Sequence, residues 1–197
     1  QTCVCANRIL VQARIHDAFV DRLAERMGAL KVGAGLEDGT TIGPLITDAA
    51  VEKVEAHIAD ATAKGATIRL GGERHARGGR FFQPTLITGA TADMRLCHEE
   101  TFGPLAALFR FETEAEVVAA ANASDYGLAA YVYTRDLGCG LRMAEALESG
   151  LLGLNAGILS TTVGPFGGVK QSGLGREGAK AGLEEFLETK FVCIGPS

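Results

Sequence analysis

Hydrophobic residues recur at helical spacing in two early segments of the chain. The first segment predicts an amphipathic helix because charged residues separate its apolar positions, which are Phe19, Leu23, Met27 and Leu30. A second helix is predicted over residues 47–64, with Thr47 as its N-cap and Gly65 at its end. Its apolar stripe consists of Val51, Val54, Ile58 and Ala61.

Short runs of apolar and β-branched residues predict strands between and after these helices. The predicted strands cover residues 6–12, 67–70, 82–87, 105–111, 130–134 and 151–155. Thr113 and Glu116 form a capping-box pattern ahead of one further helix, and Asp136 is the expected N-cap of another over 137–147. Because strands alternate with helices, the predicted fold class is α/β, with a largely parallel sheet and flanking helices.

The end of the chain is apolar again. A short helix is expected after Gly178, ending near Leu187, and the run Thr189–Ile194 predicts a terminal strand. A lone strand at a terminus has an exposed edge unless another strand pairs with it. Pairing with a second subunit would cover that edge.

Composition and charge narrow the classes of protein. A length of 197 residues suits one domain, or one domain with an appendage. Apolar residues make up 47% and charged residues 22%, which excludes a disordered chain. With 19 Lys and Arg against 24 Asp and Glu, the net charge is −5 and no basic run stands out, so we expect no nucleic-acid and no membrane partner.

Two further features concern the compartment. The longest uncharged stretch, Ser149–Val169, holds six glycines and several polar residues, so it lacks the apolar density of a membrane-spanning helix. The five cysteines have no disulfide-framework spacing, and no signal peptide precedes them. Reduced thiols are therefore expected, in the cytoplasm or in the mitochondrial matrix of a eukaryote.

The first candidate for chemistry is the Gln-Thr-Cys-Val-Cys run at residues 1–5. If residues 3–5 are extended, Cys3 and Cys5 point to the same face. Cys3 is then a candidate thiolate nucleophile, with Cys5 as a neighbour able to trap it in a disulfide; the alternative is two small hydrophobic residues at a strand edge. A zinc site would need partners such as Cys97 and His98, but no second closely spaced pair exists, so no metal site is predicted.

The second candidate is the segment at residues 97–104. His98 and Glu99 begin a metalloprotease-like pattern, but Phe102 stands where the second histidine is required. Glu99 and Glu100 precede an aromatic residue and a Gly-Pro turn, so they could bind ribose hydroxyls beside a flat ring. The alternative is a solvated acidic turn.

The third candidate is the glycine-rich segment at residues 165–178. It contains GxGxxG at Gly173, Gly175 and Gly178, but the expected strand before it and acidic residue after it are missing, so a dinucleotide fingerprint is not assigned. The histidines in polar or helical surface contexts are expected to be solvated; they are His16, His57 and His75.

The order and spacing of these motifs resemble the aldehyde dehydrogenase superfamily. Gln-x-Cys is followed, 97 positions after Cys3, by the Glu100 of Glu-Glu-x-Phe-Gly-Pro, and then by Pro-Phe-Gly-Gly and Ser-Gly-x-Gly-Arg-Glu. The resemblance extends from Gln1 to Ile194 and is greatest to succinate-semialdehyde dehydrogenases. The chain begins without Met and enters the cysteine motif at once, so we interpret it as the catalytic part of such an enzyme.

The resemblance implies a mechanism and a set of site residues. Cys3 matches the nucleophile, which forms a thiohemiacetal with the aldehyde; hydride then passes to the nicotinamide of NAD or NADP, and water hydrolyses the resulting thioester. Glu100 matches the residue that binds the nicotinamide ribose, and Phe102 the ring that positions the nicotinamide. The remaining implied roles are a tunnel wall for Phe166, a contact to the substrate's distal carboxylate for Ser160, and a redox partner of Cys3 for Cys5.

The resemblance also implies what this chain lacks. We expect a catalytic thiol domain over residues 1–175 and a C-terminal helix and oligomerisation strand over 176–197, giving a homodimer or homotetramer. The family's NAD(P)-binding domain, with its general-base glutamate and substrate-binding arginines, lies upstream of this region. The isolated chain is therefore expected not to turn over its small-molecule aldehyde. Two alternatives stay open: a dehydrogenase for another aldehyde, such as glutarate semialdehyde, and a non-catalytic assembly domain.

Overall fold

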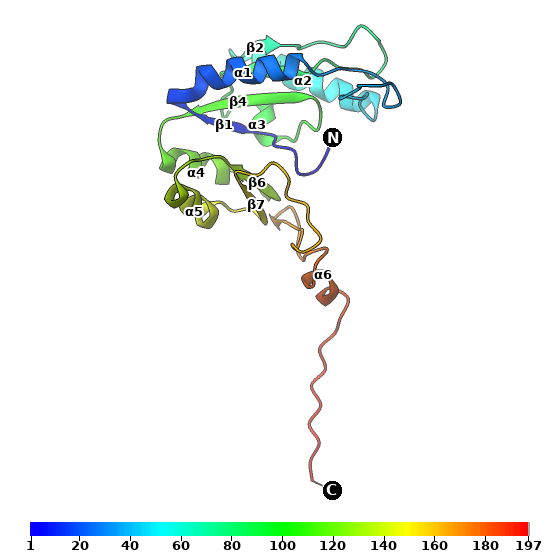
Figure 1. The fold of residues 1–197 in the computed structure, drawn as a ribbon, viewed down its shortest axis with the longest axis vertical. Helices are drawn as coiled ribbons and strands as arrows, with labels where there is room; N and C mark the ends of the chain where they lie inside the picture. Colours follow the sequence, from blue (N-terminus) through cyan, green and yellow to red (C-terminus); the bar gives the residue numbers. More distant parts are fainter. Residues whose placement is uncertain (197) are drawn as a thin grey trace. The chain divides into compact units, whose positions relative to one another are not determined.

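The computed structural model describes residues 1–196 and divides into two compact units (Figure 1). The first unit contains residues 1–121, and the second begins at Asn122. The sequence-based division into 1–175 and 176–197 stays a prediction.

A four-stranded sheet with the order β1-β4-β3-β2 forms the centre of the first unit. β1 (Ile9–Gln12) and β3 (Thr85–Thr88) both run parallel to β4 (Leu105–Phe111), and β2 (Thr67–Leu70) is antiparallel to β3. In register, Ile9 lies opposite Leu108. Parallel neighbours need crossover connections, and the helices between these strands supply them.

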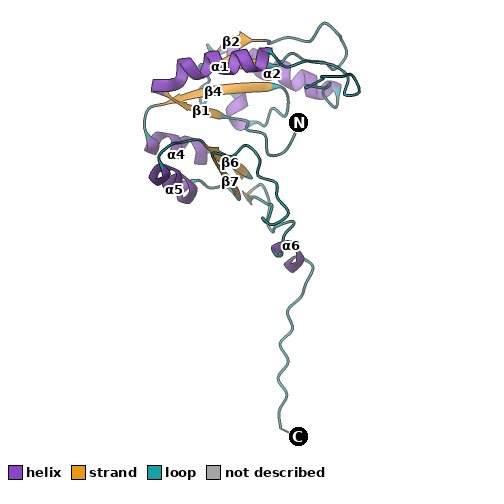
Figure 2. Ribbon diagram, in the orientation of Figure 1, coloured by secondary structure: helices purple, strands orange, loops and turns teal. Residues whose placement is uncertain are grey.

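Helices cover both faces of this sheet (Figure 2). One face carries α1 (His16–Gly28), which follows the short helix η1 (Ala13–Ile15). The other face carries α2 (Asp48–Ala63) and α3 (Arg95–His98). As predicted, the Thr47 side chain caps α2 by accepting a hydrogen bond of 3.1 Å from the backbone of Ala50.

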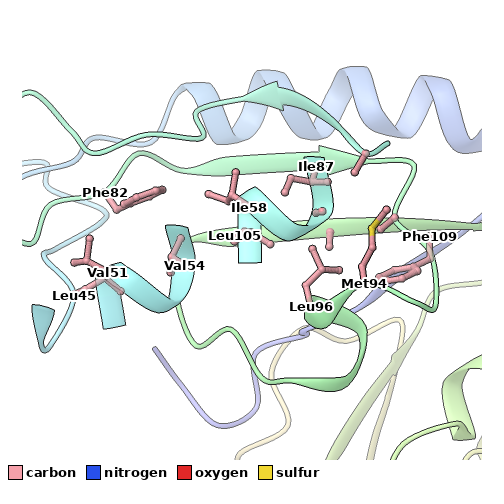
Figure 3. Close-up of a cluster of buried hydrophobic side chains, with 14 residues drawn as sticks. Leu45, Val51, Val54, Ile58, Phe82, Ile87, Met94, Leu96, Leu105 and Phe109 are labelled. Carbon is pink, nitrogen blue, oxygen red and sulfur yellow. The ribbon is translucent and has the colours of Figure 1, made fainter. Parts of the chain in front are cut away.

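The hydrophobic core is correspondingly split into two clusters. The larger one lies between α2, α3 and the sheet (Figure 3) and includes Val51, Val54, Ile58, Phe82, Ile87, Met94, Leu96 and Phe109. The smaller one, beneath α1, consists of Val11, Val20, Leu86 and Leu108. Leu86 and Ile87 are adjacent in β3 yet belong to different clusters, because consecutive strand residues point to opposite faces. The predicted α/β fold with a largely parallel sheet and flanking helices is confirmed.

The second unit is built from short strands and helices. α4 (Glu114–Asn122) ends at Asn122, which is the first residue of the second unit. β6 (Ala129–Val132) and β7 (Leu151–Leu154) are parallel and are connected through α5 (Leu137–Ala146), while β5 (Tyr126–Gly127) and β8 (Val169–Lys170) are antiparallel. The last helix is α6 (Ala181–Glu184). Within residues 1–196, every helix is too short or too polar to span a bilayer.

Several element boundaries differ from the prediction for local reasons. β3 starts after Pro84 rather than at Phe82, because proline has no N–H to donate to a strand neighbour. β7 ends before Asn155, whose φ of 53° turns the chain and whose side chain bonds to the backbone of Thr134. The helix after Gly178 is shorter than expected.

The apolar run at residues 189–194 pairs with no strand among the described residues of the single chain. Its large apolar side chains are exposed: Phe191 is 88% and Ile194 is 89% accessible. Its pairing with a second subunit therefore stays a prediction.

Candidate active site

The two N-terminal cysteines lie on a tight turn. The carbonyl of Thr2 accepts a hydrogen bond of 2.9 Å from the backbone N–H of Cys5, so the extended conformation considered for residues 3–5 is wrong. Both thiols are exposed and free. Within residues 1–196 no group of three or more His, Cys, Asp or Glu side chains could hold a metal ion. The turn thus leaves the Cys3 sulfur accessible to a small molecule.

The loop of residues 99–104 presents Glu100 and Phe102 to solvent. Thr101, between them, is buried, so its two neighbours face outward. Phe102 has a φ of 52°, a left-handed conformation that is uncommon for an aromatic residue and costs about 1–3 kcal/mol. Phe102 as a whole residue is 38% accessible, and no described residue forms an ion pair with Glu100. An exposed carboxylate beside an exposed ring suits a ligand with hydroxyl groups and a flat ring.

The close packing under this loop fixes its backbone. A Cβ atom at Gly103 would lie 2.5 Å from Cγ2 of Val54, so only glycine fits against α2 at this point. The next residue, Pro104, accepts a hydrogen bond of 2.8 Å from the backbone of Thr85 in the sheet. The loop is therefore held by both α2 and β3.

Asn7 joins the cysteine turn to this loop. Its Oδ1 accepts a hydrogen bond of 2.9 Å from the backbone N–H of Thr101, and its Nδ2 donates one of 2.9 Å to the carbonyl of Leu96. Asn7 stands two residues after the turn that carries Cys3. The structure thereby brings together two of the segments singled out in the sequence, although the sequence assigned no role to Asn7 itself.

His57 was expected to be solvated, and that prediction is wrong. The side chain is 0% accessible, with Nδ1 lying 3.0 Å from Oγ1 of Thr101 and Nε2 lying 3.1 Å from Oε2 of Glu99. Burial lowers the pKa of His57, although the hydrogen bond to Glu99 opposes that shift. Val54 and Ile58 are neighbours on the buried face of α2, and this spacing could have identified His57 as internal.

The two adjacent acids have different roles. Glu99 accepts two hydrogen bonds of 2.9 Å from the Arg95 guanidinium, which with His57 lower the pKa of Glu99 to about 2. Its carboxylate is therefore ionised and engaged within the protein. Glu100 is exposed and forms an ion pair with no described residue, so it is the acid available to a ligand.

The depressed pKa of Glu99 predicts a specific pH dependence. Because that pKa is about 2 in the folded state against 4.5 for the free side chain, stability contributed by Glu99 is present above about pH 4.5. It is lost as the pH falls toward 2. We expect Glu99→Gln to reduce the fall in the free energy of unfolding between about pH 6 and about pH 3, measured by urea unfolding. Glu100→Gln is the control, and equal falls for wild type and Glu99→Gln would contradict the prediction.

The other two candidate residues lie in the second unit. Ser160 is exposed in the loop after β7. Phe166 is half-buried, and its backbone exchanges hydrogen bonds of 2.8 and 2.7 Å with Glu177. The structure thus places Cys3, Glu100 and Phe102 in one compact unit and Ser160 and Phe166 in the other.

Known proteins resemble this chain along almost all of its length. A succinate-semialdehyde dehydrogenase [NADP(+)] of Escherichia coli is 56% identical over 195 residues, and a mitochondrial succinate-semialdehyde dehydrogenase of Rattus norvegicus is 58% identical over 196. A 3-sulfolactaldehyde dehydrogenase of Pseudomonas putida is also 56% identical. Each match covers 99% of this chain but only 38–40% of the relative, so the chain spans about two fifths of their length.

Solved structures share the fold. An NADP-dependent enzyme of E. coli superposes with a TM-score of 0.98 at 56% identity, covering 100% of this chain and 41% of that one. A succinate-semialdehyde dehydrogenase of Burkholderia pseudomallei gives 0.93 at 59% identity, covering 94% and 39%. A betaine aldehyde dehydrogenase of Staphylococcus aureus in complex with NAD+ gives 0.91 at 41% identity, covering 96% and 38%. Residues 1–192 match the aldehyde dehydrogenase family. The chain belongs to the aldehyde dehydrogenase family.

Proposed function

We propose that this chain is the catalytic part of an NAD(P)-dependent enzyme that oxidises succinate semialdehyde to succinate. One observation carries the proposal: Asn7, which stands two residues after the turn with the exposed Cys3, is hydrogen-bonded to the backbone of Thr101 in the loop that presents Glu100 and Phe102. A nucleophile and two groups suited to a nicotinamide nucleotide therefore belong to one compact unit.

Cys3 supplies the covalent chemistry in this proposal. Its thiolate sulfur adds to the aldehyde carbon, and the carbonyl oxygen takes up a proton to give a thiohemiacetal. NAD(P)+, when bound, supplies the two-electron oxidant that converts this adduct to a thioester. Water then attacks the thioester carbon, which releases the acid and returns the thiolate of Cys3. The backbone N–H of Cys3 is a candidate donor to the oxyanion formed in these steps.

Glu100 and Phe102 have the chemistry that a nicotinamide ribose needs. The carboxylate of Glu100 has two acceptor oxygens and no ion-pair partner among residues 1–196, so it can accept bonds from two ribose hydroxyls. Phe102 offers an exposed aromatic face beside it. The choice between NAD and NADP depends on residues near the adenosine ribose. Glu100 and Phe102 are proposed to contact the nicotinamide end of the cofactor, so they do not determine that choice.

The proposed substrate class is a short aldehyde with an anionic group at its far end. The names of two relatives of this chain contain succinate semialdehyde and 3-sulfolactaldehyde, and both compounds are aldehydes of this form. Ser160 is the proposed contact to the distal anion and Phe166 the proposed tunnel wall. Glutarate semialdehyde is the alternative within the same class, and a reaction in the cytoplasm or the mitochondrial matrix is consistent with either.

Cys5 is the proposed redox partner of Cys3. Transfer of two electrons from the two thiols to an oxidant such as glutathione disulfide, with loss of two protons, would join Cys3 and Cys5 and remove the nucleophile. Both thiols are exposed on one turn, so an oxidant can reach them. A disulfide across so short a loop would be strained and readily reduced.

A hybrid enzyme tests the proposed function. In it, this chain replaces the matching segment of the E. coli succinate-semialdehyde dehydrogenase, to which it aligns over 195 residues. We expect the hybrid to oxidise succinate semialdehyde and the isolated chain to show no turnover. Ser160→Ala should raise KM for succinate semialdehyde but not for butanal. A folded hybrid without activity would count against the proposal.

The isolated chain offers a second test of the same proposal. Alkylation of each cysteine by iodoacetamide can be followed by mass spectrometry. Succinate semialdehyde should slow labelling of Cys3 by forming the thiohemiacetal, whereas labelling of Cys139 serves as the internal control. If the aldehyde protects neither thiol, the non-catalytic assembly domain becomes the better explanation.

The C-terminal run is proposed to pair with a second subunit to form a homodimer or homotetramer. We expect the double variant Phe191→Asp, Ile194→Asp to shift the chain to monomers, because charged side chains in a buried strand pair are costly. Molar mass by light scattering measures the shift. Leu174→Asp, at an equally exposed apolar position, is the control. An unchanged mass for the double variant would refute the pairing.

A further inference from the structure

A buried histidine contacts both sides of the proposed cofactor-binding acid. His57 of α2 is bonded through Nε2 to Glu99 and through Nδ1 to Thr101, the residues directly before and after Glu100. The ring is completely inaccessible, and so it can meet neither substrate nor cofactor. Any effect of His57 on the reaction must therefore be exerted through the loop of residues 99–104.

The contacts specify one arrangement of protons. Glu99 is ionised beside Arg95 and can only accept, so the hydrogen between it and His57 resides on Nε2. A neutral ring then has Nδ1 as an acceptor, and the Thr101 hydroxyl donates to it. The charges that act on the ring are those of Glu99, Arg95 and Lys53. Protonation of Nδ1 would force the Thr101 hydroxyl to find another acceptor.

Thr101 connects His57 to Asn7, which stands near the cysteine turn. Its hydroxyl faces His57 and its backbone N–H donates to Oδ1 of Asn7 at 2.9 Å. Asn7 in turn donates to the carbonyl of Leu96 at 2.9 Å. One continuous set of hydrogen bonds thus runs from Arg95 through Glu99, His57 and Thr101 to Asn7, all within the first unit.

We propose that His57 is a positioning residue, which through Thr101 and Asn7 holds Glu100 and Phe102 in register with Cys3. The inference rests on the proposed function, since it takes Glu100 and Phe102 to be the groups that meet the nicotinamide ribose. It adds that their orientation is set from the interior of the protein, by a neutral imidazole with its proton on Nε2. A purely structural histidine would stabilise the core without affecting cofactor binding selectively.

Thr101→Val in the hybrid enzyme is the test of positioning. Valine keeps the volume of threonine but removes the donor to His57. We expect KM for NADP+ to rise about tenfold, equivalent to about 1.4 kcal/mol, with KM for the aldehyde within about twofold of wild type. Thr101→Ser, which retains the hydroxyl, should restore most of the cofactor affinity. Thr67→Val, at an exposed position of β2, is the matched control.

The pH profile and a spectrum give readouts that a merely structural role would not change. KM for NADP+ should rise in the wild type only at a pH lower than the ordinary imidazole pKa of about 6.5, because burial lowers the pKa of His57, and Thr101→Val should show a flatter profile. In the isolated chain, nitrogen-15 NMR should find His57 neutral at pH 7 with its proton on Nε2. A proton on Nδ1, or a charged ring at that pH, would overturn the inference even if every variant failed to fold.

Glu100→Ala separates failure of this inference from failure of the proposed function. If Glu100→Ala raises KM for NADP+ and Thr101→Val does not, the positioning role is refuted and the cofactor-binding role of Glu100 stands. If Glu100→Ala leaves KM for NADP+ unchanged, the cofactor assignment fails and the positioning role fails with it. A rise in both variants, with recovery in Thr101→Ser, supports both.

Discussion

Replacing Cys3 with serine is expected to lower kcat of the hybrid enzyme by at least about 1,000-fold, as loss of a covalent nucleophile does in other enzymes. A serine hydroxyl is almost entirely protonated at neutral pH and attacks a carbonyl only with an activating base beside it. The turn at residues 2–5 places Cys3 in an exposed position, and among residues 1–196 no basic side chain is hydrogen-bonded to its thiol. Initial rates with succinate semialdehyde and NADP+ measure the effect.

Cys139→Ser is the matched control for this experiment. Cys139 lies in α5 of the second unit and is a free thiol like Cys3, so its variant should retain activity within about twofold. Retention of activity in Cys3→Ser would show that Cys3 is not the nucleophile. Wild-type binding of NADPH by Cys3→Ser, detected by the fluorescence of this reduced cofactor, would confirm that the variant is folded and has lost only the chemical step.

Phe82→Ala is expected to lower the free energy of unfolding by about 3–5 kcal/mol. The Phe82 ring is 1% accessible and belongs to the core cluster between α2 and the sheet (Figure 3), so its removal leaves a cavity as well as lost apolar burial. Urea unfolding of the isolated chain, followed by circular dichroism, measures the change. Loss of this order would lower the ratio of folded to unfolded chains by at least about 100-fold.

Phe186→Ala removes the same side chain from an exposed position. Phe186 is 88% accessible, so the variant should change the free energy of unfolding by less than about 0.5 kcal/mol in the monomer. Equal effects of the two substitutions would mean that Phe82 is not part of the core in solution.

The regular elements of the first unit could be predicted because their signals are local. The apolar stripe of α2 and its Thr47 cap lie within one short stretch of sequence, and so does the apolar run of β4. Strand ends were less predictable, since they depend on single residues such as Pro84 and Asn155 that act on the backbone of a neighbouring segment. The terminal run is apolar enough for a strand, but strand formation requires a partner that one chain does not supply.

Part of the candidate site could likewise be predicted from the sequence, and part could not. Cys3, Glu100 and Phe102 were predicted from motifs and from resemblance to a family, because such patterns mark residues expected to contact a substrate or cofactor. Asn7 and His57 were missed because their bonds to Thr101 join residues 94 and 44 positions apart, and no periodic pattern marks such pairs. His57 was expected to be solvated because its position was interpreted as part of a helix surface, whereas it lies on the buried face of α2.

The parallel pairing of β1 with β4 has a consequence for synthesis on the ribosome. Ile9 lies opposite Leu108, and the Arg8 side chain donates to the carbonyls of Ala120 and Ala121. At about 5–20 residues per second, translation must continue for roughly 5–20 s after β1 emerges before these partners exist. The segment after the cysteine turn is thus synthesised well before the strand that fixes it in place. The free thiol of Cys3 is open to oxidants throughout that interval.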